Sequence, residues 1–145
     1  MLAGSKRRQE TRVEIQSSAQ AAGGPEQVYL EGLAAGRFQI QRCADCSQAV
    51  FYPRCVCPHC GGAALDWFSP AGEGVVYAST TVYRDAEQGG DYNVCLVDLP
   101  EGVRMMSRVA EIAPGHVRIG MRVSARIVGD GEAAKVVFVP MGAVA

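Results

Sequence analysis

The chain has 145 residues, of which 48% are hydrophobic and 20% charged, and its 14 Lys and Arg residues are balanced by 15 Asp and Glu residues. That balance excludes the strong positive field by which many proteins hold nucleic-acid phosphates. No apolar run approaches the roughly 20 residues of a membrane span, and residues 1–20 are polar where a signal peptide would be apolar. We therefore expect a cytoplasmic protein. In that compartment thiols stay reduced, so the six cysteines indicate metal ligands and core thiols rather than disulfides.

The glycine and proline content indicates the fold class. The 17 glycines and 7 prolines are typical of a chain with many turns, so we expect a mainly β structure. The length suits a small metal-stapled module followed by a compact second domain. Residues 1–24 carry the basic cluster Lys6-Arg7-Arg8 but too few large apolar side chains to repay the entropy of ordering. We predict a flexible arm there; the alternative is a docking element.

Residues 25–36 predict a short helix. Pro25 suits a helix N-terminus, and Val28, Tyr29 and Leu33 recur at the spacing of one apolar stripe. The helix is predicted to close near Gly36. Polar and apolar side chains then alternate over residues 37–42, which predicts a half-buried strand running into the first cysteine of the next motif.

Two C-x-x-C pairs predict a metal site. They are Cys43-Ala44-Asp45-Cys46 and Cys57-Pro58-His59-Cys60, with ten residues between them. Each tight turn aims two thiolates at one point, so two turns complete a tetrahedron. We predict that Cys43, Cys46, Cys57 and Cys60 bind a structural Zn²⁺ in a small ribbon. Iron could occupy the same ligands, and a closed tetrahedron leaves no position for water or substrate.

Two residues complicate the ligand set. Cys55 could replace Cys57, although the two-residue spacing of the second pair favours Cys57. His59 lies inside the turn, where its ring should face solvent, so we interpret it as a surface residue. Gly61 follows the second pair and tolerates a positive φ. Ser47, at the equivalent place after the first pair, is a less comfortable fit.

Five apolar runs follow the cysteines. Turns rich in glycine separate them, at residues 75–83, 92–99, 103–112, 121–128 and 134–139. The fourth run has Met121, Val123, Ala125 and Ile127 on one face and polar residues on the other. Five short strands closed into a barrel remove exposed edges, and five is the strand count of the OB-fold. We therefore predict a five-stranded OB-fold barrel.

We assign no catalytic residues from the sequence. His59 and His116 do not lie beside a plausible nucleophile, and Cys95 lies in a predicted strand, where a buried thiol is common. Asp85, Glu87 and Asp91 flank a glycine turn and suit a hairpin. Two arginine pairs form either a basic stripe or a solvated sheet face, of which we favour the second; they are Arg104 with Arg108 and Arg122 with Arg126.

The order of these motifs resembles the "domain of unknown function 35" family, whose members join an N-terminal helix, a rubredoxin-like zinc ribbon and a C-terminal OB-fold. The resemblance runs from residue 25 to the C-terminus, and departs at Ser47, where glycine is usual, and at the additional Cys55. We divide the chain accordingly into an arm (1–24), a helix (25–36), a zinc ribbon (37–68) and an OB-fold domain (69–145). The segments that carry the resemblance are Tyr29-Leu30-Glu31-Gly32-Leu33, Gly36-Arg37, Arg42-Cys43-Ala44-Asp45-Cys46, Tyr52-Pro53-Arg54, Cys57-Pro58-His59-Cys60-Gly61 and residues 72–82.

The resemblance implies an accessory subunit of thiolase-fold or ketosynthase-like enzymes. In such complexes the partner carries the catalytic residues, while the zinc and OB-fold protein bridges subunits and helps to cover the coenzyme A or acyl site. Similar subunits occur in archaeal acetoacetyl-CoA thiolase and hydroxymethylglutaryl-CoA synthase assemblies, in steroid side-chain aldolases and hydratases, and in an acyltransferase that acetylates phloroglucinols. We therefore expect a non-catalytic, zinc-binding structural subunit of a complex that performs acyl transfer or carbon–carbon bond formation. The specific hypothesis is a phloroglucinol-type acceptor.

Two other functions compete with this hypothesis. A single-stranded nucleic-acid binder could stack bases on Tyr77, Tyr83 and Tyr92, although we expect no nucleic acid from the balanced charge. An acyl-CoA hydrolase could use Cys95 or His116. The accessory-subunit hypothesis predicts instead that the isolated chain is inactive and exposes an apolar docking surface.

Overall fold

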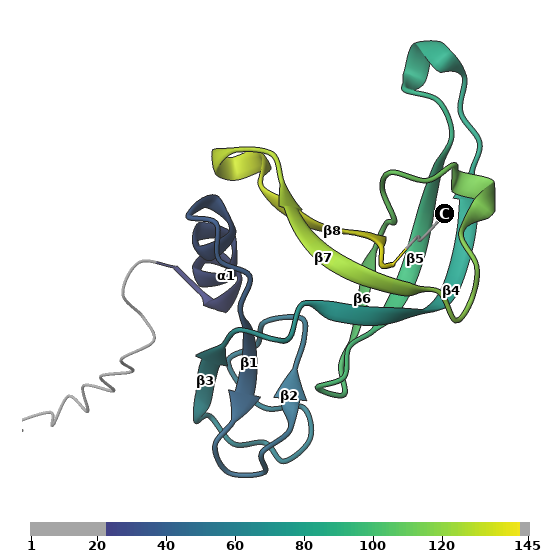
Figure 1. The fold of residues 1–145 in the computed structure, drawn as a ribbon. Coiled ribbons are helices and arrows are strands. Elements are labelled where there is room, and N and C mark those ends of the chain that lie inside the picture. Colours follow the sequence, from purple (N-terminus) through teal and green to yellow (C-terminus); the bar gives the residue numbers. More distant parts are fainter. Residues whose placement is uncertain (1–22, 143–145) are drawn as a thin grey trace, which may run out of the picture.

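The computed structural model describes residues 23–142. The predicted arm therefore lies outside the described residues, except for its last two glycines. In the described part, one short helix and a three-stranded sheet lie beside a curved five-stranded sheet (Figure 1). No helix in this part of the chain is long and apolar enough to cross a membrane.

Helix α1 (Pro25–Ala34) begins at the predicted proline and ends where Gly36 takes a left-handed φ of 81°. The Gly36 N–H donates to the Leu33 carbonyl over 2.9 Å, which satisfies one of the last free carbonyls of the helix. Tyr29 and Leu33 are buried, as predicted. The prediction was wrong for Val28, which is 38% exposed, because its side chain is rotated about 100° from Tyr29 around the helix and lies off the buried stripe.

The ribbon is an antiparallel sheet of three short strands in the order β2-β1-β3. They are β1 (Ile40–Cys43), β2 (Ala49–Val50) and β3 (Leu65–Phe68). Strand β1 corresponds to the strand predicted over residues 37–42, but it begins at Ile40 and extends to Cys43. The alternation over residues 37–42 placed Gln41 on the polar face, and this was wrong: its side chain is only 3% exposed. Its amide exchanges two hydrogen bonds with the backbone of Arg54, which offset the cost of burial.

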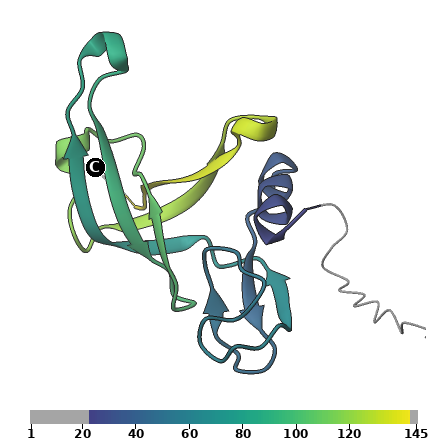
Figure 2. The same ribbon diagram turned by 180° about the vertical axis from the view of Figure 1, so that it is seen from behind.

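The second sheet has the order β6-β5-β4-β7-β8, with every neighbouring pair antiparallel. Its long strand β4 pairs with β7 near its start and with β5 along most of its length. The tip of the β4–β5 hairpin projects away from the ribbon and α1 (Figures 1 and 2). The five strands overlap the five predicted runs and confirm the mainly β, OB-fold prediction: β4 (Glu73–Val82), β5 (Tyr92–Asp98), β6 (Arg104–Ser107), β7 (Arg122–Val128) and β8 (Lys135–Pro140).

The barrel closes where its two edge strands meet. Residues after β6 run beside β8, and Val109 forms a parallel bridge with Phe138. Asn93, which is 3% exposed, donates to the Val109 carbonyl over 2.7 Å and accepts the Val109 N–H over 2.8 Å. The buried side-chain amide of Asn93 thus satisfies the backbone N–H and C=O of Val109, as a neighbouring strand would. Because this irregular segment follows β6, the third predicted run (103–112) forms a strand only over Arg104–Ser107.

One apolar core joins the helix, the ribbon and the barrel. Phe138 and Ile40 are fully buried within it, and Tyr29 and Leu33 of α1 belong to the same cluster. The cysteine end of the ribbon has a much smaller cluster around Cys43, Val50 and Cys57. The ribbon therefore rests on the barrel at one end and depends on its own cysteines at the other.

Candidate metal centre

Four cysteine sulfurs gather at the end of the ribbon. The Sγ atoms of Cys43, Cys46, Cys57 and Cys60 all lie within 4.8 Å of one another. The Cys43–Cys60 and Cys46–Cys57 sulfur pairs are each 3.6 Å apart. A tetrahedron with metal–sulfur bonds of about 2.3 Å has edges of about 3.8 Å. The four residues therefore fit one tetrahedral metal ion of the size of zinc.

The two cysteine turns have the same backbone design. The Ser47 N–H donates to the Cys43 carbonyl over 2.8 Å, and the Gly61 N–H donates to the Cys57 carbonyl over 2.9 Å. Ser47 and Gly61 have left-handed φ angles of 62° and 79°. The positive φ anticipated at Gly61 is confirmed, and Ser47 carries the steric cost of the same geometry.

Backbone amides in the second turn point at its sulfurs. The His59 N–H donates to the Cys57 sulfur, and the Gly62 N–H to the Cys60 sulfur, each over 3.4 Å. These donors favour thiolates, because hydrogen bonds to a charged form stabilise it. Negative charge can therefore be spread from the sulfurs into the backbone of the turn.

Backbone N–H groups, burial and neighbouring thiols shift the pKa values of Cys57 and Cys60 in opposite directions. Burial raises the pKa of the Cys57 thiol, but hydrogen bonds from the backbone N–H groups of Cys60 and His59, together with those of the neighbouring Cys46 and Cys60 thiols, outweigh burial and lower the pKa to about 7. The N–H of Gly62 lowers the pKa of Cys60, yet the neighbouring Cys43 thiol, burial and the Cys46 and Cys57 thiols together outweigh it and raise the pKa to about 12. A divalent cation removes this conflict, because it stabilises all four thiolates together.

Cys55 and His59 lie outside this constellation. Cys55 is exposed and its sulfur does not belong to the four-sulfur group. His59 is exposed on the second turn and contributes its backbone N–H. A closed set of four sulfurs offers a metal no open position, so the centre is built to hold the chain together.

The other residues considered from the sequence are dispersed. Cys95 is 1% exposed and its thiol contacts the Asn93 side-chain oxygen over 3.1 Å, which confirms the buried-thiol prediction. His116 lies exposed in the short helix η2 (Pro114–His116). Asp91 accepts the Arg84 N–H over 2.9 Å, so it serves the hairpin turn as predicted. These residues therefore do not form a catalytic group of the kind that a hydrolase needs.

The surface arginines and tyrosines are largely occupied by neighbours. Arg104 pairs with Asp98, Arg122 with Glu73 and Arg126 with Glu111, as expected for a solvated sheet face. Arg104 also lies 3.4 Å from the centre of the Tyr77 ring, and Arg84 lies 5.1 Å from that of Tyr92. Of the three tyrosines considered for base stacking, Tyr77 and Tyr92 thus each have an arginine over the ring, and Tyr83 is 80% exposed.

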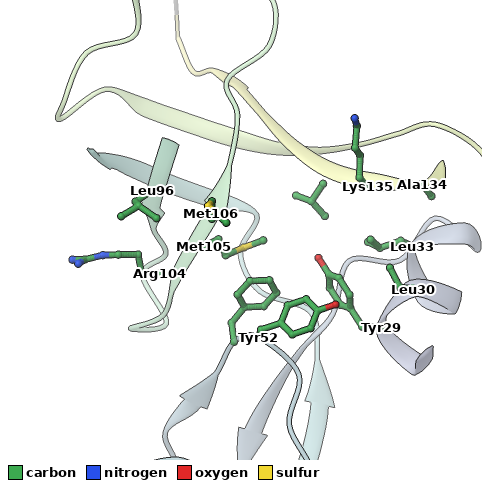
Figure 3. Close-up of a pocket in the computed structure, with 12 residues that line it drawn as sticks. Tyr29, Leu30, Leu33, Tyr52, Leu96, Arg104, Met105, Met106, Ala134 and Lys135 are labelled. Carbon is green, nitrogen blue, oxygen red and sulfur yellow. The ribbon is translucent and has the colours of Figure 1, made fainter. Parts of the chain in front are cut away.

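A groove of about 710 Å³ lies between α1, the ribbon and the barrel (Figure 3). We call it the seam groove, because it opens where β6 and β8 diverge. Sequence reasoning predicted an apolar docking surface but not its place, since the lining comes from five separate segments. Its lining residues are Tyr29, Leu30, Leu33, Phe51, Tyr52, Leu96, Arg104, Met105, Met106, Ala134, Lys135 and Val136.

Two family models match the chain in sequence order. The ChsH2 rubredoxin-like zinc ribbon domain matches residues 30–66, and the ChsH2 C-terminal OB-fold domain matches residues 67–128. Among similar sequences is a DUF35 domain-containing scaffold protein of Methanocaldococcus jannaschii. It is 32% identical over 98 residues, which cover 63% of this chain and 70% of the relative. A probable enoyl-CoA hydratase alpha subunit of Thermomonospora curvata is 36% identical over 97 residues, covering 66% of this chain but only 30% of the relative.

Solved structures show the same arrangement. A chain of the Ltp2-ChsH2(DUF35) aldolase matches with a TM-score of 0.72 and 33% identity, over 83% of this chain and 97% of that chain. A DUF35 protein of unknown function from Sulfolobus solfataricus matches with a TM-score of 0.60 at 18% identity, over 85% and 90% of the two chains, and shows the fold alone.

Fold and site together define a rubredoxin-like zinc ribbon joined to an OB-fold. The chain belongs to the DUF35 family. The resemblance drawn from its motifs is thereby confirmed.

Proposed function

We propose that this chain is a zinc-binding scaffold subunit of an enzyme complex that acts on coenzyme A thioesters, by hydration or by aldol-type carbon–carbon bond chemistry. The observation that carries the proposal is the match to the DUF35 chain of an aldolase over 97% of that chain. The sequence relatives named as a hydratase subunit and as a scaffold protein support the same direction.

The metal has a structural role in this proposal. Zn²⁺ held by Cys43, Cys46, Cys57 and Cys60 would fix the free end of the ribbon, where the chain has little apolar core. Iron would suit the same sulfurs, but the zinc-ribbon family match favours zinc. With no open ligand position, the metal leaves substrate chemistry to the partner enzyme.

The finer hypotheses concern the partner. A thiolase-fold enzyme remains our proposal for it, on the strength of the family resemblance. Of the relatives named above, those that carry the name of an enzyme are a hydratase subunit and an aldolase, and none is named for acetylation of a phloroglucinol. We therefore retain acyl transfer to such an acceptor only as a prediction to be tested with the partner in hand.

Capture of the tagged chain from its native cells tests the proposal. We expect one enzyme subunit to accompany it in stoichiometric amount, identified by mass spectrometry. The purified pair should hydrate an enoyl-CoA or cleave a β-hydroxyacyl-CoA, and the isolated chain should do neither. Turnover by the isolated chain, or stoichiometric capture of nucleic acid instead of an enzyme, would overturn it.

A further inference from the structure

The seam groove exists because the two edge strands of the barrel, β6 and β8, diverge. Ser107 donates its hydroxyl to the Val136 carbonyl over 2.9 Å, and the Val109–Phe138 bridge continues the contact. Before Ser107, no hydrogen bond joins β6 to β8 within the described residues. Helix α1 bounds the side of this opening that faces β6, and the groove occupies the space between them. An edge of the sheet is therefore left uncovered beside apolar side chains.

The groove is apolar and its rim is exposed. Leu30 on α1 is 39% exposed, Tyr52 on the ribbon 41% and Met106 on β6 72%. They come from three different elements and line one groove (Figure 3). Scattered exposed apolar residues need no explanation, but a contiguous set around a groove indicates an interaction surface.

Three packed aromatic rings form the wall of the groove where α1 meets the ribbon. Tyr29, Phe51 and Tyr52 contact one another edge to face, with ring centres 5.5 to 6.0 Å apart. The Gln41 amide anchors the backbone that follows Tyr52, through two hydrogen bonds with Arg54 of 2.7 and 2.9 Å. A surface ordered in advance loses little entropy when a partner binds.

The charges at the rim are of one sign. Among the lining residues only Arg104 and Lys135 are charged, and they lie on opposite rims and extend away from the apolar floor (Figure 3). Asp98 already neutralises Arg104, and the nearby Glu26 accepts the Tyr52 hydroxyl over 2.5 Å. Lys135 has no carboxylate partner among the described residues. An occupant with an apolar segment and an adjacent carboxylate complements both features.

We propose that the seam groove is the docking surface for the partner enzyme, and that it takes an apolar segment of that enzyme with a carboxylate placed against Lys135. This inference rests on the proposed function and adds the surface through which it operates. Met106 and Leu30 supply the apolar contact, and the aromatic cluster of Tyr29, Phe51 and Tyr52 fixes the shape of the wall.

Matched variants in the full, metal-loaded chain test the proposal. Met106→Glu places a charge in the groove, and Ile119→Glu places the same charge at an equally exposed apolar residue elsewhere, since the two side chains are 72% and 74% exposed. We expect Met106→Glu to reduce capture of the partner enzyme by about tenfold or more and Ile119→Glu to leave it within about twofold. Lys135→Glu should weaken capture and flatten its dependence on salt, whereas Lys135→Arg should preserve both. Circular dichroism confirms that each variant folds.

The outcomes separate this proposal from the proposed function. If the unaltered chain captures an enzyme and Met106→Glu captures it equally well, the groove is not the docking surface, and the scaffold function stands. If the unaltered chain captures no enzyme, both fall. A homodimer that Met106→Glu dissociates in light scattering, or dodecanoyl-CoA binding that it abolishes, would assign the groove to a second copy or to a small molecule and overturn the proposal.

Discussion

Exchange of one sulfur ligand should unfold the cysteine end of the ribbon while the barrel stays folded. Cys57→Ser removes a sulfur that lies 3.6 Å from that of Cys46 and within the four-sulfur group. Cys55→Ser is the matched control, because Cys55 is two residues away, exposed and outside the group. The first variant should lose its zinc, and the second should keep about one ion per chain.

The magnitude follows from how little else holds this end of the ribbon. Its local cluster contains one fully apolar buried side chain, Val50, besides the cysteines, with Leu65 packed against it. Burial of a valine contributes about 1.5–3 kcal/mol. Structural zinc contributes about 10–16 kcal/mol in zinc-finger peptides. Packing therefore cannot replace the metal, and the cysteine end should unfold in Cys57→Ser.

Trp67 reports this event. It is the only tryptophan of the chain, packs against the shared core and lies in β3 two residues from Leu65, the strand partner of Cys43, so loss of the Cys43 pairing loosens its strand. In Cys57→Ser its fluorescence should shift to longer wavelength, while circular dichroism retains most of the β signal of the barrel. Elemental analysis measures the zinc directly. A Cys57→Ser protein with full zinc and unshifted fluorescence, together with a metal-free Cys55→Ser protein, would refute the ligand assignment.

Three further perturbations test contacts of the fold away from the metal centre. Asn93→Ala leaves the buried N–H and C=O of Val109 without partners, which should cost about 2–5 kcal/mol in urea unfolding; a change under about 0.5 kcal/mol would contradict the role given to this amide. Gly74→Ala places a Cβ 2.5 Å from a valine methyl of β5 and should cost about 1–3 kcal/mol, seen as a lower melting temperature; an unchanged melting temperature would show that the strands separate freely. The hydrogen bond to Glu26 raises the pKa of Tyr52 to about 12. Because this folded-state pKa lies above the ordinary value of about 10, the bond stabilises the protein below about pH 10 and is lost as pH rises toward 12. Glu26→Gln should reduce that loss in unfolding measured across this range, and an identical pH profile would count against the bond.

Local signals in the sequence were sufficient for much of the fold. A proline and a glycine marked the ends of α1, and turn-rich breaks separated the five strands of the barrel. The four cysteines could be singled out because C-x-x-C spacing is itself the geometry of a metal turn. The exact division into modules at residues 36 and 68 stays a prediction, and the shared core shows that the helix, the ribbon and the barrel pack as neighbours.

Long-range contacts account for what the sequence did not predict. Strands β2 and β3 are two and four residues long, too short to show a period. Gln41 and Asn93 are polar residues in the core, and each is buried because it bonds to backbone 13 or 16 residues away. The seam groove draws on α1, the ribbon, β5, β6 and β8 together. No single stretch of sequence carries the signal for such features.

Native mass spectrometry of the complex captured through this chain tests the scaffold claim most directly. We expect one species whose mass is the sum of a subunit of an enzyme that acts on acyl-CoA, this 15.4 kDa chain and one zinc ion per copy of the chain. Detection of the zinc-loaded chain only as a monomer, under conditions that preserve other complexes, would contradict the scaffold function. A complex whose partner is not such an enzyme would contradict it as well.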